Sequence, residues 1–265
     1  MEANMTAYET ILLKIDDGIG LITLNRPEKR NAISTQMIEE LLTALDECEK
    51  SSARVVILTG AGKAFCSGMD LEGLKVVASQ SPEQNLEDSR RMARMFRCLY
   101  TFSKPLIAAV NGPAIAGGCG LATLCDFTLA VPEAKFGYTE VRIGFLPAIV
   151  SVFLIRQIGE KRARDLLLTG RIVDADEALR LGLASEIVPA DRLLDRAHEL
   201  AQSLISNSPT SLKRTKQLFI DSNSADLDRQ LEAAIQANAA IRSTHDFREG
   251  VASFLEKRPP NWRGE

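Results

Sequence analysis

The chain has 265 residues, of which 45% are hydrophobic and 25% are charged, so it has enough apolar material for a large globular core. Its formal net charge of −3 argues against nucleic acid or an anionic membrane surface as a partner, and an anionic ligand would need a local cluster of basic residues. The five cysteines show no Cys-x-x-Cys spacing, which excludes a zinc or disulfide framework pattern and favours a reducing, cytoplasmic setting. No run approaches the roughly 18 apolar residues of a membrane span, and the N-terminus lacks the apolar region of a signal peptide.

Short apolar, β-branched runs predict strands, and amphipathic segments between them predict helices. The strands are expected at residues 20–24, 54–59, 105–110 and 127–131. The first helix is expected at residues 35–50, because Met37, Leu41, Leu45 and Cys48 recur on one face with acidic residues between them. Alternating strands and helices of this kind predict a mixed α/β core.

A polar segment with a proline, residues 78–85, interrupts this pattern. It is predicted to be a loop, followed by a helix at residues 86–100. Loops in such positions often cover a binding site.

The C-terminal part of the chain is predicted to be almost wholly helical. Helices are expected at residues 174–181, 191–205, 209–221, 226–241 and 247–256, with Asp174 as an N-cap and Pro259-Pro260 as the final stop. The expected organisation is a core at residues 1–200 and a helical C-terminal region at residues 201–265.

Two glycine-containing segments stand where a strand passes through a turn into a helix. They are AFCSGMD at residues 64–70 and NGPAIAGGCGLA at residues 111–122. Glycine permits unusual backbone angles, and free N–H groups at a helix N-terminus carry partial positive charge, so two converging amides would form an oxyanion hole. Either segment alone is equally well explained as a simple turn. Neither has the G-x-G-x-x-G spacing of a dinucleotide site.

A third run, KFGYTEVRIGFLPA at residues 135–148, makes the pattern specific. Together with LNRPEKRNA at residues 24–32, CDFTLA at residues 125–130 and the two glycine segments, it appears in the order and spacing of a known family. The chain resembles the crotonase (enoyl-CoA hydratase/isomerase) superfamily over essentially its whole length.

This resemblance implies an α/β fold, a crotonase-like spiral of repeated ββα units with a helical C-terminal trimerisation region. It implies a homotrimer or hexamer acting on acyl-CoA thioesters, as in fatty acid metabolism. The oxyanion-hole amides fall on Met69 and Gly117. No separate cofactor is implied, because coenzyme A is part of the substrate.

The resemblance also implies a coenzyme A site. Its residues, carried over by motif, are Lys29, Arg30, Ala32, Ser67, Gly68, Asp70 and Leu71, with Phe254 and Lys257 reaching the adenine and phosphates from an adjacent subunit. The Lys29–Arg30 pair is the kind of local cationic patch that the charges of coenzyme A require, although alone it would be an ordinary solvated loop pair.

Hydratases of this family use two glutamates, and this sequence keeps one. Glu140 matches the glutamate of the FGYTE motif, whereas the second position is Gly120, which has no side chain. Beside Arg142 alone, Glu140 would read as a surface ion pair. Within the motif it is predicted to be a general acid/base, buried against apolar neighbours that raise its pKa towards neutrality.

One carboxylate suits a double-bond shift, which needs a single base to move a proton between two carbons. Hydration is the commoner activity among similar proteins, and a water held in the space left by Gly120 could serve it. The sequence leaves both reactions open, together with acyl chain length, which depends on a pocket expected around residues 74–99 and 148–152.

Other classes of function were weighed. A nucleophilic hydrolase lacks a histidine near a nucleophile, because His198 and His245 both lie in the helical C-terminal region. Cys66 and Cys119 are expected to be packing residues, Tyr138 a packed aromatic, and no residues have metal-ligand spacing. A non-catalytic acyl-CoA-binding or RNA-binding protein of the same fold remains the alternative, although no basic stripe supports RNA binding.

Overall fold

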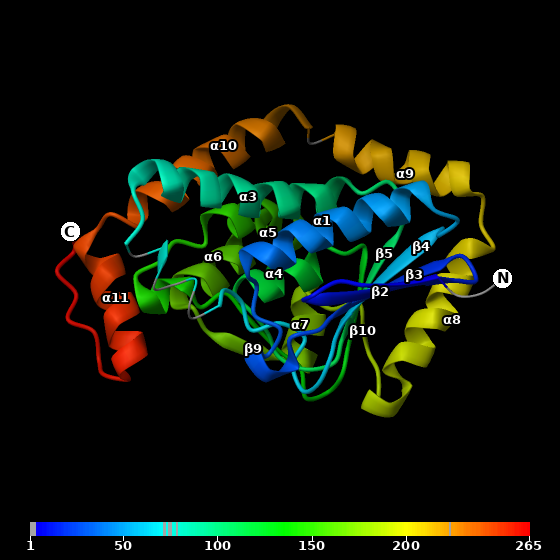
Figure 1. Ribbon diagram of the computed structural model, residues 1–265, viewed down its shortest axis with the longest axis horizontal. Coiled ribbons are helices and arrows are strands. Elements are labelled where there is room, and N and C mark those ends of the chain that lie inside the picture. The colour runs from blue at the N-terminus through cyan, green and yellow to red at the C-terminus, as the bar shows by residue number, and fades with distance from the viewer. Residues whose placement is uncertain (1–3, 71–72, 74–75, 78, 223) are drawn as a thin grey trace.

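The computed structural model describes residues 4–265 except 71–72, 74–75, 78 and 223, and Figure 1 shows the arrangement of its elements. The strands are β1 (Asn4–Ala7), β2 (Ile11–Asp16), β3 (Ile19–Leu24), β4 (Val55–Gly60), β5 (Leu106–Val110), β6 (Ala114–Ile115), β7 (Phe127–Ala130), β8 (Lys135–Gly137), β9 (Ile172–Asp174) and β10 (Glu186–Ile187). The α-helices are α1 (Thr35–Lys50), α3 (Pro82–Thr101), α4 (Gly117–Thr123), α5 (Ala148–Ile158), α6 (Glu160–Thr169), α7 (Ala175–Leu181), α8 (Leu193–Ile205), α9 (Pro209–Asp221), α10 (Ser224–Ile241) and α11 (His245–Glu256). Short 3₁₀ turns lie at η1 (Pro27–Lys29), η2 (Glu140–Ile143) and η3 (Ala190–Arg192).

The strands form two sheets. The larger has the order β1-β2-β3-β4-β5-β7-β10, antiparallel from β1 to β3 and parallel from β3 to β10, and the smaller has the order β6-β8-β9. Strands β4 and β5 are buried along nearly their whole length, as expected for central parallel strands covered on both faces. The predicted α/β core is confirmed.

Most predicted helices are confirmed, two of them to the residue. Helix α1 begins at the predicted residue because the Ser34 side chain accepts a hydrogen bond from Met37 N at 3.2 Å. Helix α7 begins after Asp174, whose side chain caps Glu177 N at 2.9 Å as predicted.

The predicted loop at residues 78–85 is wrong over its second half. Helix α3 begins at Pro82, because Ser81 and Gln84 form a capping box and proline at the first helical position needs no hydrogen-bond acceptor. The longer helix α3 lies beside α10 across the top of the molecule in Figure 1.

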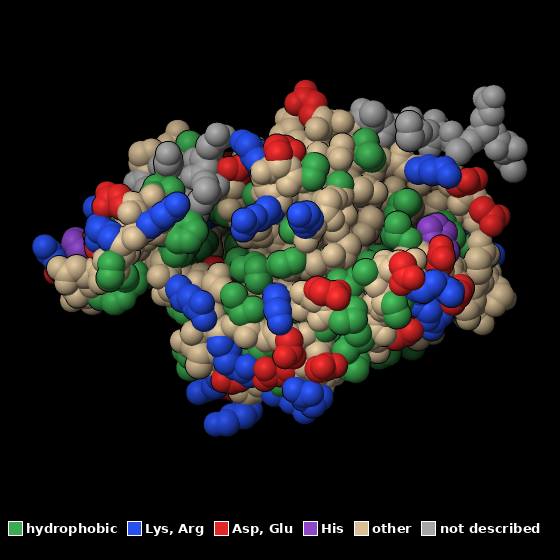
Figure 2. Space-filling model, turned by 90° about the horizontal axis from the view of Figure 1, so that it is seen from below, with side chains coloured by type: hydrophobic (Ala, Val, Ile, Leu, Met, Phe, Trp, Pro, Cys, Tyr) green, Lys and Arg blue, Asp and Glu red, His purple; other side chains and the backbone are tan. Residues whose placement is uncertain are grey.

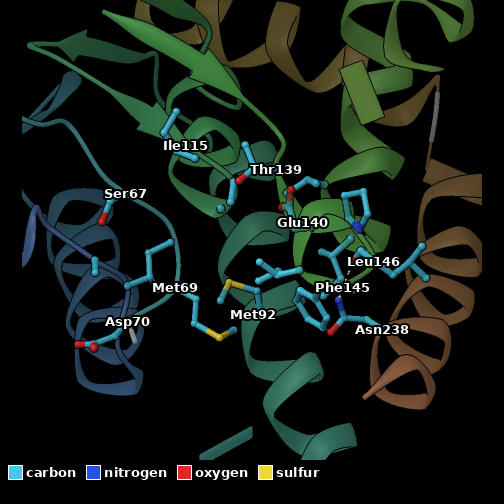
Figure 3. Close-up of a pocket in the computed structure, with 18 of the residues that line it drawn as sticks. Ser67, Met69, Asp70, Met92, Ile115, Thr139, Glu140, Phe145, Leu146 and Asn238 are labelled. Atoms are coloured by element: carbon cyan, nitrogen blue, oxygen red, sulfur yellow. Dashed lines mark hydrogen bonds between the residues drawn. The ribbon is translucent and has the colours of Figure 1, made fainter. Parts of the chain in front are cut away.

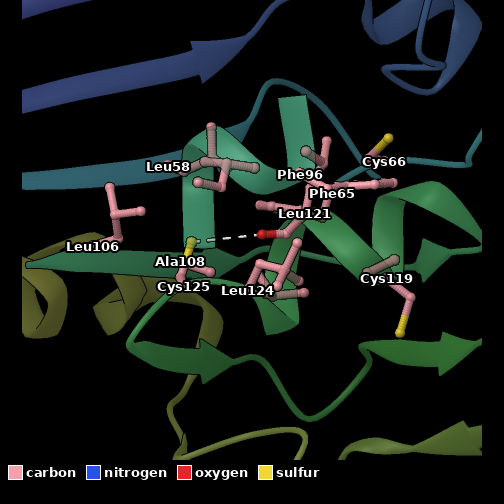
Figure 4. Packing of buried hydrophobic residues seen from close by; sticks show 14 of the residues in the cluster. Leu58, Phe65, Cys66, Phe96, Leu106, Ala108, Cys119, Leu121, Leu124 and Cys125 are labelled. Atoms are coloured by element: carbon pink, nitrogen blue, oxygen red, sulfur yellow. Dashed lines mark hydrogen bonds between the residues drawn. The ribbon is translucent and has the colours of Figure 1, made fainter. Parts of the chain in front are cut away.

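The main hydrophobic core lies between the large sheet and the helices. Figure 4 shows the part behind the two glycine segments, where Phe65 and Cys66 pack near Phe96, Leu121 and Cys119. Helix α10 belongs to this core through its buried apolar residues. The predicted boundary at residue 201 falls inside α8, and the division into two parts stays a prediction.

Helix α11 packs in a separate, smaller cluster at one end of the molecule (Figure 1). There Phe247 and Val251 contact Met69 and Phe145, which belong to segments 64–70 and 135–148. The contact is close, because a Cβ added at Gly250 would lie 2.2 Å from a backbone oxygen of η2. The C-terminal helix therefore rests directly on the segments predicted to carry the chemistry.

Candidate active site

The two glycine segments lie side by side. Phe65 N and Cys66 N both donate to Pro113 O at 3.1 Å, and Ile115 N donates to Cys66 O at 2.9 Å. The backbones come so close that a Cβ added at Gly118 would lie 2.2 Å from Cys66 O. Glycine at this position is what lets helix α4 start against the first segment.

The Met69 amide faces away from its neighbouring strand. Ile33 N donates to Gly68 O at 2.7 Å and Asp70 N donates to Ile33 O at 3.1 Å. In such a parallel bridge the residue between them, Met69, directs its own N–H to the opposite side. That side holds the second segment, since a Cβ added at Gly68 (φ +89°) would lie 3.8 Å from Gly117 N.

The Gly117 amide is the first of helix α4, and the first N–H groups of a helix have no acceptor within it. The preceding residue, Ala116, has φ 51° and ψ −123°, a conformation that strains any residue with a Cβ. Its own amide is held by Gly137 O at 2.7 Å, which fixes the strained turn. The fold therefore imposes the direction of the Gly117 N–H.

Met69 and Gly117 line one cavity of about 710 Å³. Figure 2 shows a hollow beside the end of the molecule that holds α11, with lysine and arginine side chains near its edge. Its walls come from residues within the segments 28–33, 67–70, 92–96, 115–117, 139–150 and 238–242, and from Phe254. The predicted pocket lining is confirmed in part, through Met92, Phe96 and Ala148–Val150, whereas Leu74 lies outside the described residues.

Glu140 enters the same cavity as the first residue of η2 (Figure 3). It is 8% exposed, and its Oε2 has no hydrogen-bond partner among the described residues. Burial raises the pKa of Glu140 to about 7, against a smaller lowering by a hydrogen bond from its own backbone. The predicted burial and rise in pKa are confirmed. The alternative of a surface ion pair with Arg142 does not occur among the described residues, because Glu140 is buried and its Oε2 is unpartnered.

The wall at Gly120 is apolar and closed. A Cβ added there would lie 3.0 Å from Val150 Cγ1 and 3.1 Å from Phe96 Cε1. Phe96 and Val150 therefore narrow the space beside Gly120, and the expectation of a water there stays a prediction. A side chain at the second glutamate position would require these neighbours to shift by a few tenths of an ångström.

The remaining polar groups near Glu140 are packing residues. Tyr138 is fully buried and its hydroxyl lies 3.1 Å from Thr123 Oγ1. Burial raises the pKa of the Cys66 and Cys119 thiols to about 12, so neither is a thiolate nucleophile at neutral pH. The predicted packing roles of Tyr138, Cys66 and Cys119 are confirmed.

The basic loop at the edge of the cavity is held by Asn31. Arg30 and Asn31 both have left-handed backbone angles, with φ 51° and 54°. The buried Asn31 side chain accepts from Arg26 N at 2.9 Å and donates to Ala64 O at 2.8 Å, which ties the loop to the first glycine segment. Lys29, Arg30 and Ala32 all line the cavity, as their predicted role requires.

Asp70 lines the cavity, but its carboxylate is engaged by the basic loop. Arg26 Nη2 donates to Asp70 Oδ2 at 2.7 Å and Arg26 Nη1 donates to Ala32 O at 2.6 Å, while Lys29 Nζ lies 3.8 Å from the same carboxylate. The sequence analysis missed Arg26, although it stands inside the motif at residues 24–32. Asp70 is thus a partner of this loop.

The structure places the other predicted coenzyme A residues in different positions relative to the cavity. Ser67 lines the cavity, and Leu71 lies outside the described residues. Phe254 lines the cavity of its own chain from α11, where a contribution from an adjacent subunit was expected. Lys257 is exposed at the end of α11 and is not part of the described lining of its own chain's cavity, and its contact from an adjacent subunit stays a prediction.

Sequence reasoning also missed part of the cavity wall beyond Glu140. Thr139 and Phe145 stand next to recognised positions, and their place in the motif could have marked them. Asn238 lies on α10 and Arg242 directly follows its last residue, and neither gave a signal, because polar residues on and beside an amphipathic helix are usually exposed.

The comparison with known proteins agrees with this geometry. The sequence profile described as "Enoyl-CoA hydratase/isomerase" matches residues 14–265. The chain belongs to this family.

A Thermus thermophilus protein named "Putative enoyl-CoA hydratase" is 46% identical to this chain. The match covers 95% of this chain and 100% of the Thermus protein. An Escherichia coli protein named "2,3-dehydroadipyl-CoA hydratase" is 35% identical over 92% of the chain and 94% of its own length. The crystal structure of an enoyl-CoA hydratase/isomerase from Xanthobacter autotrophicus matches with a TM-score of 0.87 and 31% identity, covering 95% of this chain and 98% of that one. The crotonase-like fold implied by the sequence is confirmed.

Two features are absent from the described part of the chain. It contains no group of three or more His, Cys, Asp or Glu side chains placed to hold a metal ion. None of its helices is both long enough and apolar enough to cross a membrane.

Proposed function

We propose that this enzyme stabilises the enolate of an acyl-CoA thioester, with Glu140 as the proton-transferring group and the Met69 and Gly117 amides as the oxyanion hole. The observation that carries the proposal is the cavity that these three residues share. A carboxyl group with a pKa of about 7 is poised to accept and return a proton near neutral pH. Two fixed amides would stabilise the negative charge that develops on the thioester oxygen.

The wall at Gly120 favours a double-bond shift between the 3- and 2-positions of an enoyl chain. Glu140 removes a proton from Cα, the oxyanion hole holds the resulting dienolate, and protonated Glu140 returns the proton to Cγ. Each step needs one carboxyl group, and the described cavity wall offers one buried carboxyl away from the ion-paired Asp70.

Hydration is the second candidate, and the names of the relatives favour it. Glu140 would then deprotonate a water that adds to Cβ and would return that proton to Cα. The reaction balances with one carboxyl group, provided that this group serves both carbons in turn. The apolar side chains packed at Gly120 supply no second acid or base for this reaction.

The proposed coenzyme A site follows the basic loop. Lys29 and Arg30 lie at the cavity and supply positive charge for the phosphates, while Ala32 and Ser67 present backbone and small side chains. Gly68 is not part of the described lining, although both of its chain neighbours are, and its assignment remains part of the proposal. Arg26 and Asp70 hold the loop in place. Phe254 would contact the ligand from α11, and the assignment of Leu71 and Lys257 remains part of the proposal.

We also propose a homotrimer or hexamer in a reducing, cytoplasmic setting, without a separate cofactor. Exposed Leu218 and Phe219 on α9 supply apolar surface for subunit contacts, and the chain's cysteines are free. A non-catalytic acyl-CoA-binding or RNA-binding role is less well supported, since a buried carboxyl without a partner has no purpose in a passive scaffold.

The test presents trans-2-enoyl-CoA and 3-enoyl-CoA substrates in parallel and follows the absorbance of the conjugated thioester. A double-bond shift predicts a gain of absorbance with the 3-enoyl substrate and little loss with the 2-enoyl substrate. Loss of absorbance with the 2-enoyl substrate alone would establish hydration instead. Absence of change with both, at several chain lengths and with demonstrated coenzyme A thioester binding, would contradict the enzymatic proposal.

A further inference from the structure

A buried polar network connects α3 to α10. Arg242 is 2% exposed, and its Nη1 donates to Asp88 Oδ2 at 2.8 Å while its Nη2 donates to Asn238 Oδ1 at 3.0 Å. Ser89 Oγ donates to the same Asn238 oxygen at 2.9 Å, and Asn85 Oδ1 lies 3.4 Å from Arg242 Nη1. Groups of this kind are costly to bury, so their place needs an explanation.

The network borders the cavity. Asn238 and Arg242 are part of its wall, the Arg242 guanidinium lies 5.3 Å from the Phe145 ring centre, and Asn238 Nδ2 donates to Leu146 O at 3.2 Å. In Figure 3, Asn238 lies beside Phe145 and Leu146, on the opposite side of the view from Ser67 and Asp70. The network is therefore at the end of the cavity away from the basic loop, where the acyl group would lie if coenzyme A binds at that loop.

The charges of this network are balanced within the protein. Arg242 pairs with Asp88, which lies 3.8 Å from Arg91 Nη1, and Arg91 Nε lies 3.2 Å from Glu39. Because these charges cancel, the network can offer a ligand hydrogen-bond donors but no net charge. The Arg242 Nε has no hydrogen-bond partner among the described residues, and Nη2 has a second hydrogen beyond the one given to Asn238.

A cavity for an unsubstituted hydrocarbon chain gains nothing from a buried guanidinium in its wall. On the basis of the proposed function, we propose that the substrate's acyl group carries an oxygen acceptor at its distal end. Arg242 binds this oxygen and so determines which acyl groups the enzyme prefers. A hydroxyl or carbonyl oxygen and a carboxylate share this chemistry. The balanced charge favours the neutral oxygen, because a carboxylate would add a negative charge next to Asp88.

The test measures equilibrium binding of saturated acyl-CoA thioesters, which do not react, by titration calorimetry. Chains of four, six and eight carbons are compared in three forms: unsubstituted, with a terminal hydroxyl, and with a terminal carboxylate. The wild-type protein is expected to prefer an oxygen-bearing chain about 10-fold or more at one of these lengths, the scale of a hydrogen bond to a charged group. The hydroxyl and carboxylate series distinguish the two sources of oxygen.

Arg242→Met should abolish that preference and leave binding of the unsubstituted chains within about twofold. Arg229→Met, which removes an exposed arginine from the same helix, is the matched control and should keep the preference. Equal or better binding of unsubstituted chains at every length by the wild-type protein would overturn the proposal, whether or not the variants fold. Equal weakening of all ligands by Arg242→Met would overturn it too. Failure of every thioester to bind would instead contradict the proposed function.

Discussion

The two walls on either side of the proposed reaction centre differ in chemistry. The η2 wall holds Glu140 with an unpartnered oxygen and a pKa of about 7, whereas the α4 wall at Gly120 is filled by Phe96 and Val150. In relatives with two glutamates both walls would carry a carboxyl group. Here a carboxyl group for the proposed proton transfer stands on one side only.

This difference shows how a fold can keep its electrostatics while it changes its acid/base groups. The proposed oxyanion amides at Met69 and Gly117 belong to the backbone, so they depend on the fold and not on the side chains around them. Glu140 depends on burial alone for its raised pKa. Changes that remove or add a carboxyl group on either wall therefore test whether the asymmetry matters.

The largest expected effect comes from Glu140→Gln, which keeps the shape of the side chain and removes its basicity. Turnover should fall on the order of 100-fold or more, the usual scale for an acid/base group. Steady-state kinetics on the substrate identified in the enoyl-CoA assay measure it. Glu133→Gln, a change of the same kind at an exposed position, should leave turnover unchanged, and near-normal turnover of Glu140→Gln would rule out its role.

The same substitution should stabilise the protein at high pH. Glu140 has a folded-state pKa of about 7, above its unfolded value of 4.5, so the folded state holds its proton more tightly. Its contribution to stability is complete below pH 4.5 and is lost as the pH rises through 7. Between pH 5 and pH 8 the loss amounts to roughly 2 to 3 kcal/mol of unfolding free energy, and Glu140→Gln should lack it. Urea unfolding at both pH values measures the difference, and an identical pH dependence in both proteins would contradict the raised pKa.

A carboxyl group added to the closed wall should not restore a two-glutamate enzyme. Gly120→Glu forces atoms against Val150 and Phe96 and should lower the unfolding free energy by about 1 to 3 kcal/mol. Gly120→Ala adds only the first atom of that side chain and should cost less. A well-folded Gly120→Glu with faster hydration than the wild type would show that the wall is open after all.

The smallest effect is expected at the edge of the cavity. Lys29→Ala removes one partly exposed positive charge and should raise KM for the thioester about twofold to fivefold without changing kcat, and added salt should shrink the difference. Lys50→Ala, an exposed lysine at the end of α1, is the matched control. A fall in kcat with unchanged KM would place Lys29 in the chemistry instead of in binding.

The sequence predicted the elements with strong patterns and missed those without them. The buried runs of β4 and β5 and the amphipathic stripe of α1 were clear. Helix α5 was missed because AIVSVFLIRQI is apolar on nearly all sides and shows no helical period. Strand β2 was missed because the charged residues Lys14 and Asp16 interrupt its apolar run.

The candidate site was predictable only where it lies in local motifs. Glu140, Met69 and Gly117 stand in such motifs, and the structure places all three at one cavity. The closed wall at Gly120 was not predictable, because Phe96 and Val150 reach it from distant helices. Arg242 was not predictable either, since only the packing of α10 against α3 shows that it is buried.

The central claim is that Glu140 alone moves the proton at the carbon next to the thioester. The most direct measurement is deuterium exchange from heavy water into the α-position of a bound, saturated acyl-CoA, followed by mass spectrometry. The wild-type protein should incorporate deuterium, faster as the pH rises through about 7, and Glu140→Gln should incorporate almost none. Exchange at the same rate in both proteins would contradict the account.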